Sequence, residues 1–274
     1  MRIWPISISP GRVSCASFQA GTVAIASISY SPKNERALVL FSLAAVVAAG
    51  AYTTLSLGDG VMMAAMDGQR GPAFAVLLFA MWSTMMMAMM LPSAAPAVLL
   101  FMGLNRRLVK GSGGTLAVAA FISGYLVVWT GFSAAAVAMQ IVLGEKIALD
   151  MMMATASVYI GGGLLMAAGI YQMSPAKAAC LRKCQAPLIY FARHWQSGTM
   201  GAGRMGLAHG LYCIGCCWAL MGLLFYGGVM QPIWIVGLAI YVAAEKVIPA
   251  SNTLSRFSGL VLIGWGLWTV WPAH

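Results

Sequence analysis

Residues 207–228 read LAHGLYCIGCCWALMGLLFYGG and contain no Asp, Glu, Lys or Arg. A helix of about 20 apolar residues is long enough to cross the hydrocarbon core of a bilayer. The same stretch carries one imidazole and three thiols, on His209, Cys213, Cys216 and Cys217. At about 100° per residue, these side chains fall within an arc of about 100° on one helix face. The stretch therefore predicts a membrane helix with a soft-ligand face.

Thiols and imidazoles are the ligands that Cu(I) and Zn(II) select. Cysteine also packs as a small hydrophobic residue, so ordinary helix packing is the alternative. Three cysteines and one of only three histidines in the chain lie in this short run, and that density favours metal or thiol chemistry. We expect copper, as Cu(I), to be the bound ion, with zinc as the second candidate.

The composition extends this reading to the whole chain. Hydrophobic residues make up 61% and charged residues 8% of the sequence, whereas soluble proteins contain about 25% charged residues. We predict an all-α membrane protein, a polytopic bundle of about seven transmembrane helices that occupies residues 37–272. The predicted spans are 37–57, 73–96, 115–141, 153–173, 207–228, 233–250 and 256–272. Pro92 and Pro96 should kink the second apolar run and leave 97–103 near the interface.

The basic residues predict the orientation of these spans. When Lys and Arg are assigned to alternate sides of the seven spans, fourteen fall on one side, and only Arg70 and Lys146 fall on the other. Because positive charge accumulates on the cytoplasmic side, we expect a cytoplasmic N terminus and a periplasmic C terminus in a bacterial inner membrane. The net charge of +10 is thus a topology signal and does not imply a nucleic-acid partner.

Two longer segments lie outside the predicted spans. Residues 1–36 lack the compact apolar core of a secretory signal, and we expect a disordered tail. The basic stretch 174–206 is the predicted cytoplasmic loop. Within it, Ser174 and Pro175 are typical of a helix start and Pro187 of a stop. One helical turn then separates Cys180 from Cys184, and this pair either joins the metal path or is a chance spacing.

Methionine is the second unusual feature, with 21 residues in the chain. The run MWSTMMMAMMLPSAAP at 81–96 places two rows at four-residue spacing: Met81, Met85 and Met89, and Met86 with Met90. A thioether is uncharged and can ligate Cu(I), so stacked rows could relay the ion through a membrane. Filling of gaps between helices is the alternative. Further methionines lie in the predicted external loops: Met62, Met63, Met66 and Met151–Met153.

Two charged residues, Glu245 and Lys246, interrupt the sixth span. Ionisable residues at such depth are costly and are candidates for function. Lys246 can snorkel to the interface. Glu245 lies near the depth of His209, and we expect it to orient that imidazole through a hydrogen bond. An ion pair between Glu245 and a Lys or Arg is the alternative.

Several motifs of this sequence resemble those of a known protein family. The stretches MWSTMMMAMMLPSAAPAVLLF, YQMSPAKAACLRKC and RMGLAHGLYCIGCCWALM, with the later EK pair, resemble a bacterial family of predicted metal-binding integral membrane proteins, which are sometimes labelled copper chaperones. The resemblance covers roughly residues 37–250 and implies metal binding in the membrane, without supplying a reaction. The family's motif residues correspond here to Met85, Met86, Met89, Met90, Pro92, Cys180, Cys184, His209, Gly210, Cys213, Cys216, Cys217, Trp218 and Glu245.

Enzyme motifs are scarce, because the sequence has no P-loop, no G-x-S-x-G elbow and no H-E-x-x-H motif. We therefore predict a protein that binds Cu(I) and transfers it across the inner membrane or to a client metalloenzyme. A client metalloprotein or a soluble metal donor is the expected partner besides the bilayer, and self-association stays open. The alternatives are a membrane thiol–disulfide oxidoreductase and an assembly subunit without transport.

Overall fold

The computed structural model describes residues 33–66, 71–108, 114–146, 157–229, 231–248 and 251–271, and its regular elements there are all helices. They are α2 (Lys33–Met66), α3 (Pro72–Leu108), α4 (Gly114–Lys146), α5 (Val158–Gln172), α6 (Pro175–Gln185), α7 (Pro187–Arg193), α8 (Gly198–Gly222), α9 (Leu224–Gly227), α10 (Pro232–Val247) and α11 (Ser251–Val270). The all-helical prediction is confirmed. The tail predicted over 1–36 falls mostly outside the described residues, and α2 already begins at Lys33.

Three helical segments are long and apolar enough to cross a membrane within the described part of the chain. They are Pro72–Leu108, Gly114–Val142 and Gly198–Gly227, the last of which joins α8 and α9. The shorter α5 is also apolar. The other predicted spans coincide with α2, α10 and α11, so a bundle of seven crossing helices stays a prediction.

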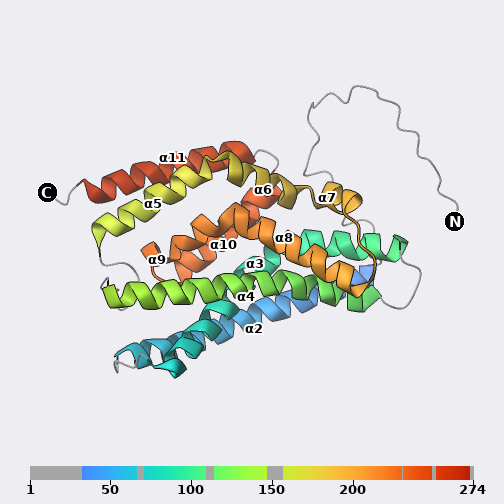
Figure 1. The fold of residues 1–274 in the computed structure, drawn as a ribbon, viewed down its shortest axis with the longest axis horizontal. Helices are drawn as coiled ribbons and strands as arrows, with labels where there is room; N and C mark the ends of the chain where they lie inside the picture. The colour runs from blue at the N-terminus through green and yellow to red at the C-terminus, as the bar shows by residue number, and fades with distance from the viewer. Residues whose placement is uncertain are drawn as a thin grey trace.

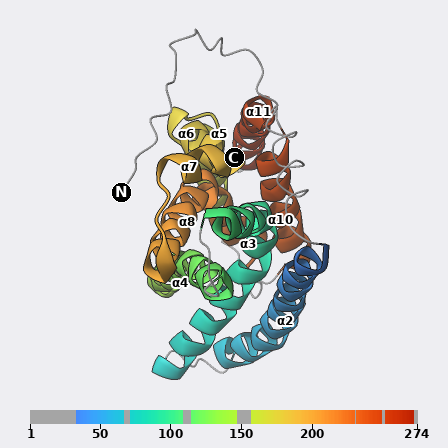
Figure 2. The same ribbon diagram turned by 90° about the vertical axis from the view of Figure 1, so that its right-hand side faces the viewer.

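The long helices lie roughly along one axis, and consecutive members run in opposite directions (Figure 1). Helices α5 and α11 lie together along one side of the molecule, and α2 lies along the other (Figures 1 and 2). Figure 2 shows α3 changing direction along its length. Pro92 and Pro96 lie inside this helix, and a proline within a helix removes a backbone donor and bends the axis. The predicted kink is thus present.

Glycines set the closest helix contacts. A Cβ added at Gly206 of α8 would lie 2.0 Å from the backbone oxygen of Phe121 in α4. A Cβ at Gly162 of α5 would lie 2.9 Å from the backbone oxygen of Gly266 in α11. Small residues allow helix backbones to approach this closely, and many membrane helices pack in this way. These contacts fix α8 against α4 and α5 against α11.

Among the described residues, the core consists of two hydrophobic clusters. The larger contains the methionines of α3 together with the thiols of α6 and α8. The smaller is aromatic: Phe101 stacks on Phe121, with ring centroids 4.7 Å apart, and Phe191 meets both rings edge-on. Residues 97–102, predicted to lie near the interface, are all buried in the structure.

The region 174–206 is more ordered than a loop. Helix α6 begins after Ser174, whose hydroxyl accepts a hydrogen bond from the backbone N–H of Lys177, and it ends before Pro187. The predicted start and stop of this short helix are confirmed. Helix α7 follows at once, and α8 begins at Gly198, nine residues before the predicted span.

Candidate metal centre

Helix α8 buries all four ligands that the sequence placed on one face. His209, Cys213, Cys216 and Cys217 are each less than a tenth exposed. All four belong to α8, which packs against α4 and α6. The predicted common face is therefore buried in the interior of the protein.

The thiols form hydrogen bonds with their own helix. The Sγ atoms of Cys216 and Cys217 each donate to the backbone oxygen of Cys213 at 3.0 Å. Such bonds to a carbonyl one turn earlier are the usual resting arrangement of a small polar side chain within a helix. Within the described residues, no group of three or more His, Cys, Asp or Glu side chains is arranged as a ready metal site. Metal binding at this face would require the thiols to exchange these partners.

Cys213 is the residue where the polar contacts of three other helices meet. Its Sγ lies 3.2 Å from the Tyr125 hydroxyl of α4 and accepts a hydrogen bond from the Lys246 ammonium of α10 at 3.0 Å. Tyr125 also donates to the backbone oxygen of Met90 at 3.2 Å, and Lys246 donates to the Ser93 hydroxyl at 2.7 Å. The Ser93 hydroxyl donates in turn to the same Met90 oxygen at 2.8 Å. The result is a closed polar ring around one thiol.

Lys246 thus corrects a sequence-based expectation. The length of its side chain made snorkelling to the interface the expected outcome, but the ammonium points inward to Cys213 and Ser93. The physical reason is that a thiol and a hydroxyl at one depth offer two acceptors within reach of the lysine stem.

The imidazole of His209 lies among aromatic rings. Its centroid is 6.1 Å from that of Phe121 and 5.9 Å from that of Tyr125, both on α4. His209 is therefore one turn before Cys213 and next to the same tyrosine. His194, another of the three histidines, is exposed and stacks on Tyr190.

Helix α6 brings two more thiols to α8. Cys184 is buried and belongs to the same cluster as Cys216. The Sγ of Cys180 lies 2.7 Å from the position that a Cβ on Gly215 would take, so this glycine makes room for the sulfur. Burial raises the pKa of the Cys180 thiol, Cys216 raises it further, and the Lys183 ammonium lowers it in part. The cysteines are free thiols within the described residues.

The methionine rows are buried beside these thiols. Met85, Met86, Met89 and Met90 are all fully or almost fully covered and belong to the same cluster as the thiols of α8. Tyr125 connects the Met90 backbone to the Cys213 thiol, so the end of the rows and the thiols lie at similar depth. Of the methionines that the sequence predicted to be external, Met62 is partly exposed and Met63 is 67% exposed, while the side chain of Met66 and the cluster 151–153 lie outside the described residues.

Glu245 corrects a second expectation. Its carboxylate is not directed to His209 but forms a buried ion pair with Lys177, with the shorter N···O distance at 2.6 Å. Tyr241 and Ser255 donate to the same carboxylate at 2.8 and 2.7 Å. Gln172 contacts both members of the pair. The ion-pair alternative describes Glu245, because a buried carboxylate needs a counter-charge and further donors.

Three important residues were missed or misjudged from the sequence: Tyr125, Lys177 and Lys246. Their common signal is a polar or charged group at a depth where such groups are costly. That signal was available for Lys246 and Tyr125. Lys177 lies outside the predicted spans, where lysine is unremarkable, so only the packing of α6 beside α10 reveals it.

The donors near Cys213 are soft ligands. Four buried thiols share one cluster with the buried thioethers of α3, His209 is buried one turn before Cys213, and the Glu245 carboxylate is paired with Lys177. Thiols and imidazole are ligands for both Cu(I) and Zn(II), and thioethers add to the ligands available for Cu(I).

The comparisons with known proteins agree with this chemistry. No curated protein and no solved structure matches the chain. A family model described as "PpoB2: Copper chaperone" matches residues 79–269, which are more than half of the chain and contain the methionine rows and the thiols of α6 and α8. The protein therefore belongs to the PpoB2 copper chaperone family, as its motifs predicted.

Proposed function

We propose that this protein is a membrane-embedded copper chaperone that holds Cu(I) at the thiols of α8 and hands it to a client metalloprotein. The observation that carries the proposal is the environment of Cys213. Its buried thiol is next to Cys216 and Cys217, and a lysine ammonium contacts its sulfur at 3.0 Å. A fixed cation beside a thiol is unexpected for simple apolar packing.

The charges explain why a lysine belongs there. Cu(I) held by two thiolates carries a net charge of −1, and an isolated buried charge in a low-dielectric interior is strongly unfavourable. The Lys246 ammonium cancels that charge without becoming a ligand itself. The copper–thiolate complex and the Lys246 ammonium together would thus carry no net charge. Cys213 is the proposed central ligand, and one of Cys216, Cys217 and Cys184 supplies the second thiolate. The remaining thiols stay protonated, and His209 is a neutral candidate ligand.

The methionines supply a route for the ion. The buried side chains of α3 include two rows, Met85 with Met89 and Met86 with Met90. The rows end at Met90, whose backbone oxygen belongs to the polar ring. Thioethers bind Cu(I) without adding charge, so they can relay it at little electrostatic cost. Met62 and Met63 would collect or release the ion at the external end. The same ligands serve either direction of transfer.

The proposed setting is a bacterial inner membrane, with α2, α3, α4, α5, α8, α10 and α11 crossing it. The alternating direction of these helices supports this arrangement (Figure 1). So does the charge distribution, because fourteen basic residues then share the cytoplasmic side. In this orientation the thiol cluster lies toward the cytoplasm, where thiols stay reduced and able to bind metal.

X-ray absorption at the copper edge tests the ligand set directly. The full chain, purified in detergent under reducing conditions and loaded with Cu(I), should show a Cu(I) edge and a first shell dominated by sulfur. Cys213→Ser should replace part of that sulfur signal. Cys15→Ser, at a cysteine near the N terminus that is not among the proposed ligands, should leave the signal unchanged. A first shell of only oxygen or nitrogen, or a spectrum that Cys213→Ser does not alter, would contradict the proposal.

A further inference from the structure

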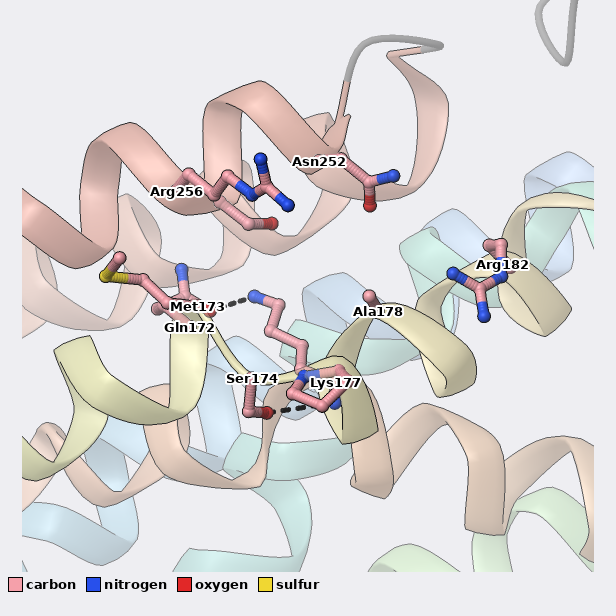
Figure 3. Close-up of a pocket in the computed structure, with 10 residues that line it drawn as sticks. Gln172, Met173, Ser174, Lys177, Ala178, Arg182, Asn252 and Arg256 are labelled. Carbon is pink, nitrogen blue, oxygen red and sulfur yellow. Dashed lines mark hydrogen bonds between the residues drawn. The ribbon is translucent and has the colours of Figure 1, made fainter.

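A second polar site lies where α5 ends and α6 and α11 begin. A cavity of 330 Å³ is lined there by residues of all three helices. Figure 3 shows Arg256 and Asn252 on α11 facing the first turns of α6, with Arg182 farther along α6. A volume of this size falls within the range of small-ligand pockets, about 300–1,000 Å³. The cavity is separate from the thiol cluster.

The floor of the cavity is charged but balanced. Lys177, Gln172 and Ser255 form its buried part. The Lys177 ammonium is paired with the Glu245 carboxylate behind the floor, so this pair adds no net charge. The floor is also rigid, since Tyr241 and Ser255 both donate to that carboxylate. It therefore contributes shape and polarity to the cavity rather than attraction for an ion.

The exposed edge of the cavity, which we call the rim, carries positive charge that is not paired. Arg182 and Arg256 line the cavity, and neither side chain has an ion pair or hydrogen bond within the described residues. Two guanidinium groups on opposite helices, with the Asn252 amide beside them, provide many donors and a net charge of +2. Guanidinium groups bind phosphate oxygens in a bidentate manner. The rim therefore fits a phosphate-bearing anion.

The surroundings favour a lipid over a free phosphate. Met173 lines the cavity and is 43% exposed. Leu260 lies one turn after Arg256 on the same face of α11 and is also exposed. Exposed apolar side chains next to a cationic pocket suit a molecule with a phosphate and an acyl chain. Basic pockets between helices on the cytoplasmic side are typical sites for anionic headgroups.

We propose that this cavity binds the phosphate of an anionic phospholipid headgroup, with the acyl chain along Met173 and Leu260. The site rests on the proposed placement of the protein in a membrane, in which this end of the bundle faces the cytoplasmic leaflet. It would tie α5, α6 and α11 together from outside, whereas the Lys177–Glu245 pair ties α6 to α10 from inside.

The test compares two charge-matched variants of the full chain, purified from membranes in detergent. Arg182→Gln with Arg256→Gln removes the rim charges. Arg193→Gln with Arg204→Gln removes two exposed arginines outside the cavity lining, from α7 and the start of α8. Native mass spectrometry with phosphatidylglycerol or phosphatidylcholine then measures retained lipid. We expect the wild type to prefer phosphatidylglycerol and the rim variant to lose that preference about tenfold or more, with little change in the control.

The other outcomes are equally informative. Equal losses in both variants would show general surface attraction and overturn the site. Stabilisation of the wild type, but not of the rim variant, by inorganic phosphate without any lipid preference would show a phosphate site and overturn the lipid. Flotation of membranes separates the two proposals, because protein in the soluble fraction would contradict the membrane placement itself.

Discussion

Lys246 lies on the same turn of α10 as Glu245, yet the two side chains serve different sites. Glu245 binds Lys177 on α6, and Lys246 reaches Ser93 on α3 and Cys213 on α8. Adjacent residues on a helix are separated by about 100°, so they naturally face different neighbours. The acidic residue secures the packing of the helices, and the basic residue meets the thiols.

The charge of Lys246 predicts which metal the site prefers. Lys246→Met should lower the ratio of Cu(I) to Zn(II) affinity by at least about tenfold, because a unit charge a few ångströms away acts more favourably on the more negative copper complex. Lys246→Arg keeps the charge and should preserve most of the ratio. Competition titrations with chromogenic chelators measure both affinities. An unchanged ratio in Lys246→Met would show that the ammonium has no part in selectivity.

The methionine rows are testable by removing sulfur while keeping volume. Met85→Leu with Met89→Leu should cost under about 1.5 kcal/mol in stability, since both side chains are similar in size and apolarity. If the thioethers relay Cu(I), the double variant should load copper into vesicle-reconstituted protein much more slowly, with zinc loading little changed. Copper loading at the wild-type rate would reduce the rows to core packing.

At the scale of single residues, the sequence predicted which residues belong to the candidate site better than it predicted which residues they contact. Helical spacing was sufficient to place Cys213, Cys216 and Cys217 on one face. The partner of Glu245 was misjudged because Lys177 is 68 residues away in the chain. No periodicity relates two such positions. The direction of Lys246 could not be predicted either, because a long flexible stem reaches the interface or an internal thiol equally well.

At the scale of helices, α4 and α8 form the pair that positions the candidate site. Gly206 permits the contact with the Phe121 backbone, and the same interface holds Tyr125 next to Cys213. The polar ring therefore depends on how closely two helices approach. The sequence shows where the glycines are, but it does not show which helix each glycine contacts.

Gly206→Ala should destabilise this pair. The new Cβ would meet a backbone oxygen that cannot turn away, and such overpacking costs about 1–3 kcal/mol. Gly131→Ala on α4 is the matched control, because nothing lies within 4 Å of its Cβ. Alanine in a helix interior should there be neutral or stabilising by up to about 1 kcal/mol. Thermal unfolding in detergent, monitored by circular dichroism, compares them; equal unfolding temperatures would contradict the close contact.

The sequence predicted which segments are helical more accurately than it predicted where each helix begins and ends. The apolar runs and the Ser174 and Pro187 signals predicted α6 and the long helices. Helices α2, α8 and α11 nevertheless begin before the predicted spans at 37, 207 and 256, because polar residues extend them beyond their apolar parts. Hydropathy marks the apolar part of a helix, whereas backbone hydrogen bonds continue past it.

At the scale of the whole molecule, the distribution of Lys and Arg predicts the topology. Reporters fused after Ser112 or Gly198 should report the cytoplasm, and reporters fused after Gly68 or at His274 should report the periplasm. Active alkaline phosphatase and fluorescent protein fusions provide complementary readouts. A cytoplasmic signal at His274 would mean that one of the seven predicted spans is not a crossing.

The central claim is that the thiols of α8 are the main copper site, and the copper content of a variant tests it most directly. Cys213, Cys216 and Cys217 are replaced together by serine, which keeps the size but is a poor ligand for a soft metal. Purified from copper-supplemented cells, this triple variant should remain in the membrane and lose most of the copper that the wild type and Cys15→Ser retain. Copper bound to the triple variant at the wild-type stoichiometry would contradict the assignment of the site.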